Sequence, residues 1–114
     1  MRRSIVISAL ALIALPVMAQ EEGPSNITCA AAIGAAQVIL ALDEQNDTSE
    51  TRAELSVLTK ARWESAISAG EAADLNAAQK ATSVELERIM VPVLNGDAGS
   101  QEYLGQVIED CLDL

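Results

Sequence analysis

The sequence predicts an all-α fold, a small bundle of about four helices closed by one disulfide bond. No stretch of the chain shows the polar and apolar alternation that is typical of a half-buried strand, and helix-forming residues dominate. Four segments have helical periodicity, and turn-forming residues separate them. Two cysteines, Cys29 and Cys111, stand at the start of the first segment and near the end of the last.

The first 19 residues predict a secretory signal peptide. Arg2 and Arg3 give a positive start, an apolar stretch from Ile5 to Leu15 follows, and Val17-Met18-Ala19 forms a small-residue cleavage pattern. The apolar stretch is short of the roughly 20 residues that a membrane-spanning helix needs. We therefore expect residues 1–19 to be removed and residues 20–114 to form a single small helical domain, either periplasmic or secreted. The paired arginines leave the general secretory and twin-arginine routes both open.

The charge balance excludes some classes of partner. The chain has 17 acidic and seven basic residues, a net charge of −10. Removal of the signal peptide would leave five basic residues against all 17 acidic ones, a net charge near −12. Because binding to phosphate groups needs clustered Lys and Arg, we expect no nucleic-acid binding. We also expect no stable membrane insertion once the signal is cleaved.

The two cysteines predict one structural disulfide. In an oxidising compartment, an even count with no other thiol to compete indicates that Cys29 and Cys111 pair. The chain-entropy model gives an upper value of about 4.5 kcal/mol for closing so long a loop. A redox-active pair would have its cysteines close in sequence, and two thiolates without histidine leave a zinc site incomplete. The sequence therefore predicts no cofactor.

The first helix is expected over 27–42, with Ser25 or Asn26 as its cap and "DEQNDTS" as the break after it. Its apolar residues go all the way round, and Gln37 is its only strongly polar side chain. A helix that is hydrophobic on every side is either buried or in a membrane. At a length of about 24 Å it is short of the roughly 30 Å hydrocarbon core. We therefore expect a central core helix wrapped by the other three.

The second helix is expected to begin after Asp47 and to run to about Ala69, with Gly70 as its stop. Asp47 and Glu50 have the spacing of a capping box. A wide apolar arc runs along this helix, made by Leu55, Leu58, Trp63, Ala66, Ile67 and Ala69. Arg62 falls within the arc, so we expect it to snorkel or to meet a carboxylate at the edge of the core.

The third helix is expected from its cap Asp74 to about Val91, where Pro92 and the "NGDAGS" turn would end it. Its apolar stripe consists of Leu75, Ala78, Thr82, Leu86, Ile89 and Met90. The fourth helix is expected from its cap Ser100 to the C-terminus. Its apolar face consists of Tyr103, Leu104, Val107, Ile108 and Cys111.

One loop has the outline of a calcium site. Places one, three, five, seven and twelve of "DEQNDTSETRAE" are filled by Asp43, Gln45, Asp47, Ser49 and Glu54. The loop departs from the EF-hand pattern because Thr48 stands at the glycine position and Glu50 where an apolar residue anchors the loop. The first interpretation is an acidic connection between two helices, and a degenerate calcium loop is the second.

Trp63 and Arg62 are candidate partner-binding residues, because tryptophan and arginine are favoured at binding hot spots. The competing interpretation of Trp63 is the main core residue of a small bundle. Acid pairs such as Glu109 and Asp110 diverge on a helix, so they do not form a paired catalytic site.

No catalytic constellation is present in the sequence, which has no histidine, nucleophile motif or glycine-rich phosphate loop. We therefore predict that the chain is not an enzyme. The first functional hypothesis is non-catalytic binding of a protein partner, as an interaction, inhibitor or chaperone-like module. The alternative is a carrier of a small apolar ligand or of a divalent cation. The sequence specifies neither the partner nor the oligomeric state.

Overall fold

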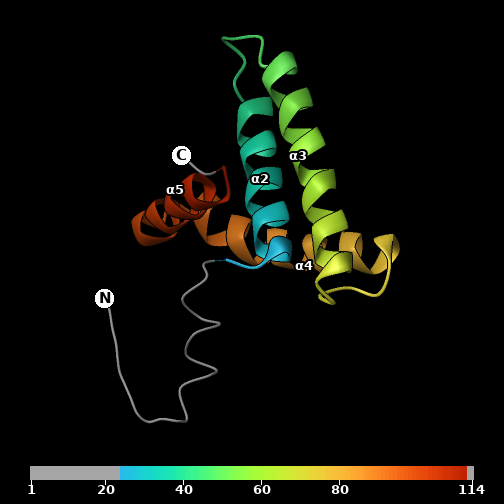
Figure 1. Ribbon diagram of the computed structural model, residues 1–114. Helices are drawn as coiled ribbons and strands as arrows, with labels where there is room; N and C mark the ends of the chain where they lie inside the picture. The colour runs from blue at the N-terminus through green and yellow to red at the C-terminus, as the bar shows by residue number, and fades with distance from the viewer. Residues whose placement is uncertain (1–23, 113–114) are drawn as a thin grey trace, which may run out of the picture.

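The computed structural model describes residues 24–112, and within this range the chain forms four α-helices and no strand (Figure 1). The helices are α2 (Asn26–Ala41), α3 (Ser49–Ser68), α4 (Leu75–Leu94) and α5 (Ala98–Leu112). The predicted all-α fold with four helices is confirmed. The predicted signal peptide at 1–19 lies outside the described residues. Among the helices of residues 24–112, none combines the length and hydropathy needed to cross a bilayer.

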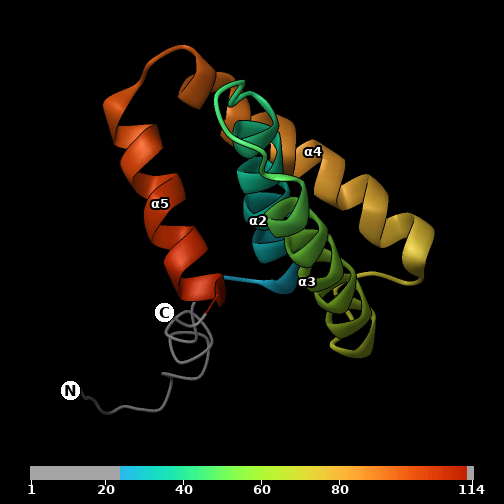
Figure 2. The ribbon, with the colours of Figure 1, turned by 90° about the horizontal axis from the view of Figure 1, so that it is seen from above.

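Helix α2 lies at the centre of the bundle. Seen from above, it lies between α5 and α3, with α4 passing across it (Figure 2), and it contacts all three. The run from Cys29 to Ile33 is fully buried, and Ile33 and Cys29 are the largest side chains with almost no exposure. The remaining buried residues of α2 are alanines, so neighbouring helices approach its backbone closely. The predicted central helix is confirmed for this half of α2.

The second half of α2 is less covered than its all-round hydrophobicity predicted. Val38, Ile39 and Leu42 are 38%, 41% and 62% exposed. Figure 1 shows the reason, because α2 and α3 stand side by side as a hairpin while α4 crosses near its base. Only the first half of α2 is therefore enclosed by helices on every side.

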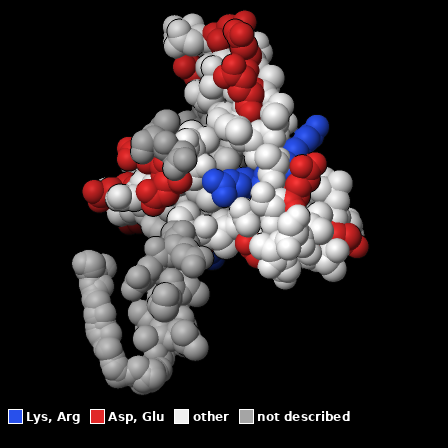
Figure 3. Space-filling model, viewed as in Figure 1, with Lys and Arg blue, Asp and Glu red and all other residues white. Residues whose placement is uncertain are grey.

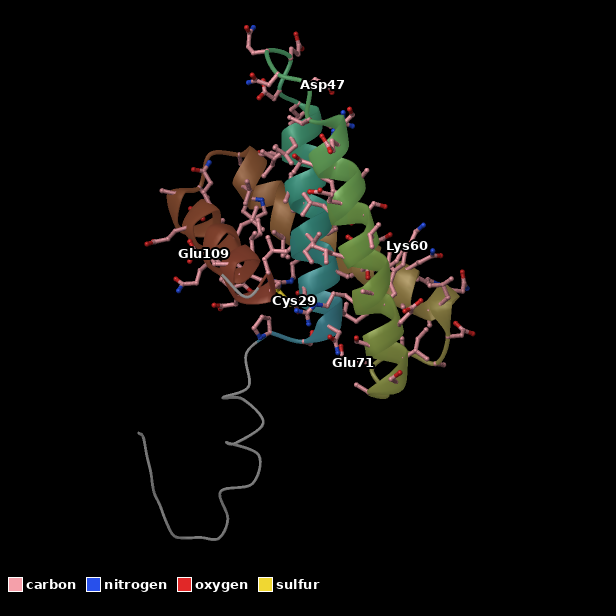
Figure 4. All side chains as sticks on the ribbon, turned by 45° about the horizontal axis from the view of Figure 1, so that its top comes forward. Cys29, Asp47, Lys60, Glu71 and Glu109 are labelled. Atoms are coloured by element: carbon pink, nitrogen blue, oxygen red, sulfur yellow. A yellow bond between two sulfur atoms is a disulfide. The ribbon has the colours of Figure 1, made fainter. Side chains whose placement is uncertain are left out.

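The predicted disulfide is confirmed. Cys29 in the first turn of α2 is bonded to Cys111 in the last turn of α5, with their Cα atoms 5.4 Å apart (Figure 4). Both cysteines are buried, and no described cysteine is free. The bond therefore fixes the end of α5 against the most deeply buried part of the bundle.

The N-terminus of α2 is held by local and distant groups. The Ser25 hydroxyl accepts a hydrogen bond from the Thr28 amide at 3.1 Å, so Ser25 is confirmed as the cap. Glu71, from the α3–α4 connection, accepts from the amides of Asn26 and Ile27 at 3.3 and 3.1 Å (Figure 4). A carboxylate at this end also complements the helix dipole. The sequence did not predict this contact, because 45 positions separate Glu71 from Asn26.

The start of α3 differs from the prediction. Thr48, not Asp47, is the N-cap, and its side chain makes no capping hydrogen bond. Asp47 instead accepts from the Ser49 amide two residues on, at 3.0 Å, which is an Asx turn. The Thr48 hydroxyl donates to the Leu40 carbonyl at 3.0 Å. The capping box with Glu50 was therefore wrong, because this local turn uses the Asp47 carboxylate.

Helix α3 ends at Ser68, just before Gly70, which has a φ of +81°. Glycine adopts this left-handed conformation without the strain that a side chain would cause. The predicted stop at Gly70 is confirmed. At the next helix start, the Asp74 side chain accepts from the Ala77 amide at 2.8 Å, which confirms the predicted cap of α4.

The structure differs from the prediction at two points in the junction between α4 and α5. Helix α4 continues through Pro92 to Leu94, because a proline in the last turn removes only one backbone hydrogen bond and leaves the chain after it free to stay helical. Helix α5 begins at Ala98, two residues before the predicted cap. Asp97 caps it, since its carboxylate accepts from the Ser100 amide at 2.9 Å.

Most residues of the predicted apolar faces are buried or half-buried, and a few are exposed. Buried positions of α3, α4 and α5 include Leu55, Ala66, Ala78, Thr82, Ile89, Met90, Leu104, Val107 and Cys111. Leu58, Leu75 and Tyr103 were placed on these faces but are 41%, 50% and 47% exposed. Leu75 and Tyr103 lie near the starts of α4 and α5, where fewer side chains of neighbouring helices pack against them.

Candidate functional site

Two grooves open on different faces of α2, and they differ in charge. The first lies between α2, α3 and α4 and has a volume of about 620 Å³. We call it the cationic groove, and its lining includes Gly34, Gln37, Arg52, Lys60, Trp63 and Leu86. The second lies between the C-terminal parts of α2 and α4 and the side of α5, with a volume of about 540 Å³. We call it the apolar groove, and its lining includes Ile39, Leu42, Asp43, Leu94, Leu104 and Ile108.

Trp63 forms part of the wall of the cationic groove. Its indole Nε1 donates to the Thr82 hydroxyl of α4 at 2.9 Å, and that hydroxyl donates to the Ala78 carbonyl at 2.7 Å. The indole is half-buried. Trp63 is therefore fixed between α3 and α4, yet it keeps a surface on the groove.

The charged lining of the cationic groove is basic. Arg52 and Lys60 line it, and no aspartate or glutamate that the structure describes does. Arg52 Nε donates to the Thr48 hydroxyl at 2.9 Å, and Gln37 Nε2 donates to the Arg52 carbonyl at 3.1 Å. Figure 4 shows Lys60 extending from α3 on the side where α4 lies. Two cations thus border one groove in a chain with a net charge of −10.

Two basic residues outside this groove, Arg88 and Arg62, have partners within the chain. Arg88 pairs with Glu85 at 2.8 Å, the one ion pair found in residues 24–112. Arg62 donates to the Asn26 side-chain oxygen at 3.0 Å and to the Cys111 carbonyl at 2.8 Å. Arg62 therefore meets an amide oxygen and a carbonyl at the edge of the core, where the sequence had suggested snorkelling or a carboxylate. Trp63 lines the cationic groove, and Arg62 does not line it.

The apolar groove has the opposite electrostatic character. Among residues 24–112, Asp43 is the only charged residue that lines it. Glu102 and Glu109 stand three residues before and four residues after Gly105, which lines it from α5, so both exposed acids share the stripe of Gly105 at the solvent edge. Figure 3 shows acidic atoms gathered over the tip of the α2–α3 hairpin and over α5. The groove is thus an apolar surface with an acidic rim.

Four residues of the predicted calcium loop, Asp43, Gln45, Asp47 and Ser49, form hydrogen bonds within the turn between α2 and α3, whereas Glu54 lies within α3. Asp43 accepts from the Gln45 amide at 2.9 Å and from the Asn46 side chain at 3.0 Å, and Asp47 accepts from Ser49. Within residues 24–112, no three His, Cys, Asp or Glu side chains are grouped as metal ligands. The calcium hypothesis therefore has no preformed set of ligands.

Hydrogen bonds lower the pKa of several carboxyl groups. The Asn46 side chain lowers the pKa of Asp43, and the Ser49 side chain lowers that of Asp47. The Arg88 guanidinium lowers the pKa of Glu85, and the Ser100 hydroxyl lowers that of Asp97. A general acid at neutral pH needs a raised pKa. These four carboxylates are instead acceptors that fix turns, a helix start and an ion pair.

No family model, curated protein or solved structure matches this chain. The two grooves are therefore the features that bear on function. Sequence reasoning identified Trp63 but missed Arg52 and Lys60, because their position at one groove depends on how α3 and α4 pack against α2. The one available signal was spacing, since Arg52, Lys60 and Trp63 fall on one side of a helix.

Proposed function

We propose that this protein is an exported, non-catalytic binding protein whose apolar groove receives a basic amphipathic helix of a protein partner. The observation that carries the proposal is an open apolar groove whose one charged lining residue in the described part of the chain is acidic. Leu42 and Leu94 line it and are each 62% exposed. Large exposed apolar side chains grouped in a concave surface are typical of interaction sites.

The shape and charge of the groove favour a particular kind of partner. An amphipathic helix binds a groove through apolar side chains at positions i, i+3, i+4 and i+7. Its flanks would face Asp43 on one side and the acidic residues Glu102 and Glu109 of α5 on the other. Lys and Arg at those flanks would be attracted, while an acidic helix would be repelled. The partner is therefore expected to be cationic.

Export is part of the same proposal. The N-terminal sequence has the signal pattern, and the buried Cys29–Cys111 bond is of a kind that persists in an oxidising compartment. Both features support a periplasmic or secreted location.

Calorimetric titration with a synthetic helical peptide tests the binding proposal. The peptide carries leucines along one face and lysines on both flanks. Replacing Leu42 or Leu94 with Gln should weaken binding roughly tenfold, because each change removes most of the benefit of burying a leucine. Val57→Gln is the matched control, since Val57 is 66% exposed on α3 and does not line the groove.

Two outcomes would contradict the proposal. One is the absence of binding, and the other is equal weakening by Val57→Gln and Leu42→Gln. A second peptide, with glutamates in place of the lysines, tests the charge argument. Equal affinity for both peptides would show that the acidic rim has no part in recognition.

A further inference from the structure

Gly34 borders the cationic groove in a way that packing within the protein does not explain. It lies in the middle of α2, where glycine costs roughly 1 kcal/mol relative to alanine. A Cβ atom added at Gly34 would meet no heavy atom within 4 Å. No neighbouring helix therefore requires glycine at this position. Its effect is to leave open space along the α2 side of the groove.

The other walls of the groove combine apolar and cationic groups. Trp63 and Leu86 supply large apolar surfaces from α3 and α4, and Val38 supplies one from α2. Arg52 and Lys60 both come from α3, so the two positive charges lie along one wall. Neither forms an ion pair with a described residue. A ligand would thus meet an apolar surface and a positive edge together.

We propose that the cationic groove binds a small amphipathic carboxylate. Its apolar chain or ring would lie against Trp63 and the open space at Gly34, and its carboxylate would meet both Arg52 and Lys60. Arginine suits this role because its planar guanidinium can donate two parallel hydrogen bonds to a carboxylate. The volume of about 620 Å³ falls within the usual range for small-molecule sites. The proposal is independent of the partner helix at the apolar groove.

Trp63 provides a direct readout, because it is the only tryptophan in the sequence. The disulfide-bonded protein is titrated with decanoate below its micelle concentration while the indole emission is recorded. Decanol and decyltrimethylammonium have the same alkyl chain with a neutral or a cationic head group. We expect a saturable emission change with decanoate and roughly tenfold weaker binding of decanol, as two partly exposed ion contacts would give. Decyltrimethylammonium should give no saturable change.

Substitutions locate the ligand. Gly34→Leu should keep or raise the melting temperature, since leucine favours a helix and the space is open. It should also weaken the binding of decanoate at least tenfold, because the leucine side chain fills the groove. Lys60→Gln should weaken the binding of decanoate about threefold. Lys80→Gln is the matched control, because Lys80 is exposed on α4 and does not line the groove, and it should change nothing.

Several results would overturn the proposal. They are equal responses to all three head groups, no response to decanoate, or full binding by a folded Gly34→Leu variant. If that variant does not fold, equal effects of Lys60→Gln and Lys80→Gln would overturn it independently. The peptide titration concerns the apolar groove, and the decanoate titration the cationic one. Failure of either proposal is therefore distinguishable from failure of the other.

Discussion

At the scale of single residues, Arg62 joins three parts of the chain. From the middle of α3 it donates to the Asn26 side chain at the start of α2 and to the Cys111 carbonyl in the last turn of α5. The two acceptors lie beside the two ends of the disulfide-linked segment. A planar guanidinium can reach both at once through separate nitrogens, whereas the compact ammonium of lysine lacks this fixed fork.

Arg62→Lys should therefore lower the free energy of unfolding by about 1 kcal/mol, the usual net contribution of one lost hydrogen bond. Urea denaturation of the oxidised protein measures it. Arg88→Lys is the control, because the Arg88 side chain is 61% exposed and its pair with Glu85 contributes little in water. Equal losses in the two variants would contradict a structural role for Arg62.

At the scale of the elements, the sequence predicted helix ends well where one local signal stood alone. Asp74 was the single cap candidate for α4 and caps it, whereas Ser25, the cap of α2, was one of two candidates beside Asn26. Asp47 failed because its carboxylate can form an Asx turn as well as a cap. Ser100 failed because Asp97, three residues earlier, offered a competing acceptor. Such competition between neighbouring polar groups depends on the path of the chain, which local patterns do not fix.

The cap of α5 gives a test at this scale. Asp97→Ala should lower the melting temperature by roughly a few degrees, and Ser100→Ala should lower it less, because only the first removes the acceptor for the helix amide. Thermal denaturation followed by circular dichroism measures both. A larger loss in Ser100→Ala would restore Ser100 as the essential capping residue.

The same cap should make stability depend on pH. The Ser100 hydroxyl lowers the pKa of Asp97 in the folded state, so the ionised carboxylate favours folding. This contribution is present above the unfolded pKa of about 4 and is lost as the pH falls through the lower folded value. The difference in melting temperature between the wild type and Asp97→Ala should therefore shrink as the pH falls below about 4.

At the scale of the whole molecule, the two grooves beside α2 differ in charge, because basic residues line one and an acidic residue lines the other. The sequence predicted a central first helix from its all-round hydrophobicity, and burial of Cys29 to Ile33 confirms it. It did not predict the exposed second half or the two grooves. Those depend on where α4 and α5 cross α2, and on a disulfide that holds the end of α5 at the base of the hairpin. The net charge of the chain likewise gave no indication of a groove bordered by Arg52 and Lys60.

One measurement tests the two-groove arrangement directly. Amide shifts of the ¹⁵N-labelled, disulfide-bonded protein are recorded first with the basic peptide and then with decanoate. The peptide should shift the amide signals of Leu42, Leu94 and Gly105, while decanoate should shift the amide signal of Gly34 and the indole signal of Trp63. Two separate, saturable sets of shifts are the expected result. A single shared set, or small shifts spread over the surface without saturation, would contradict two binding grooves of opposite charge.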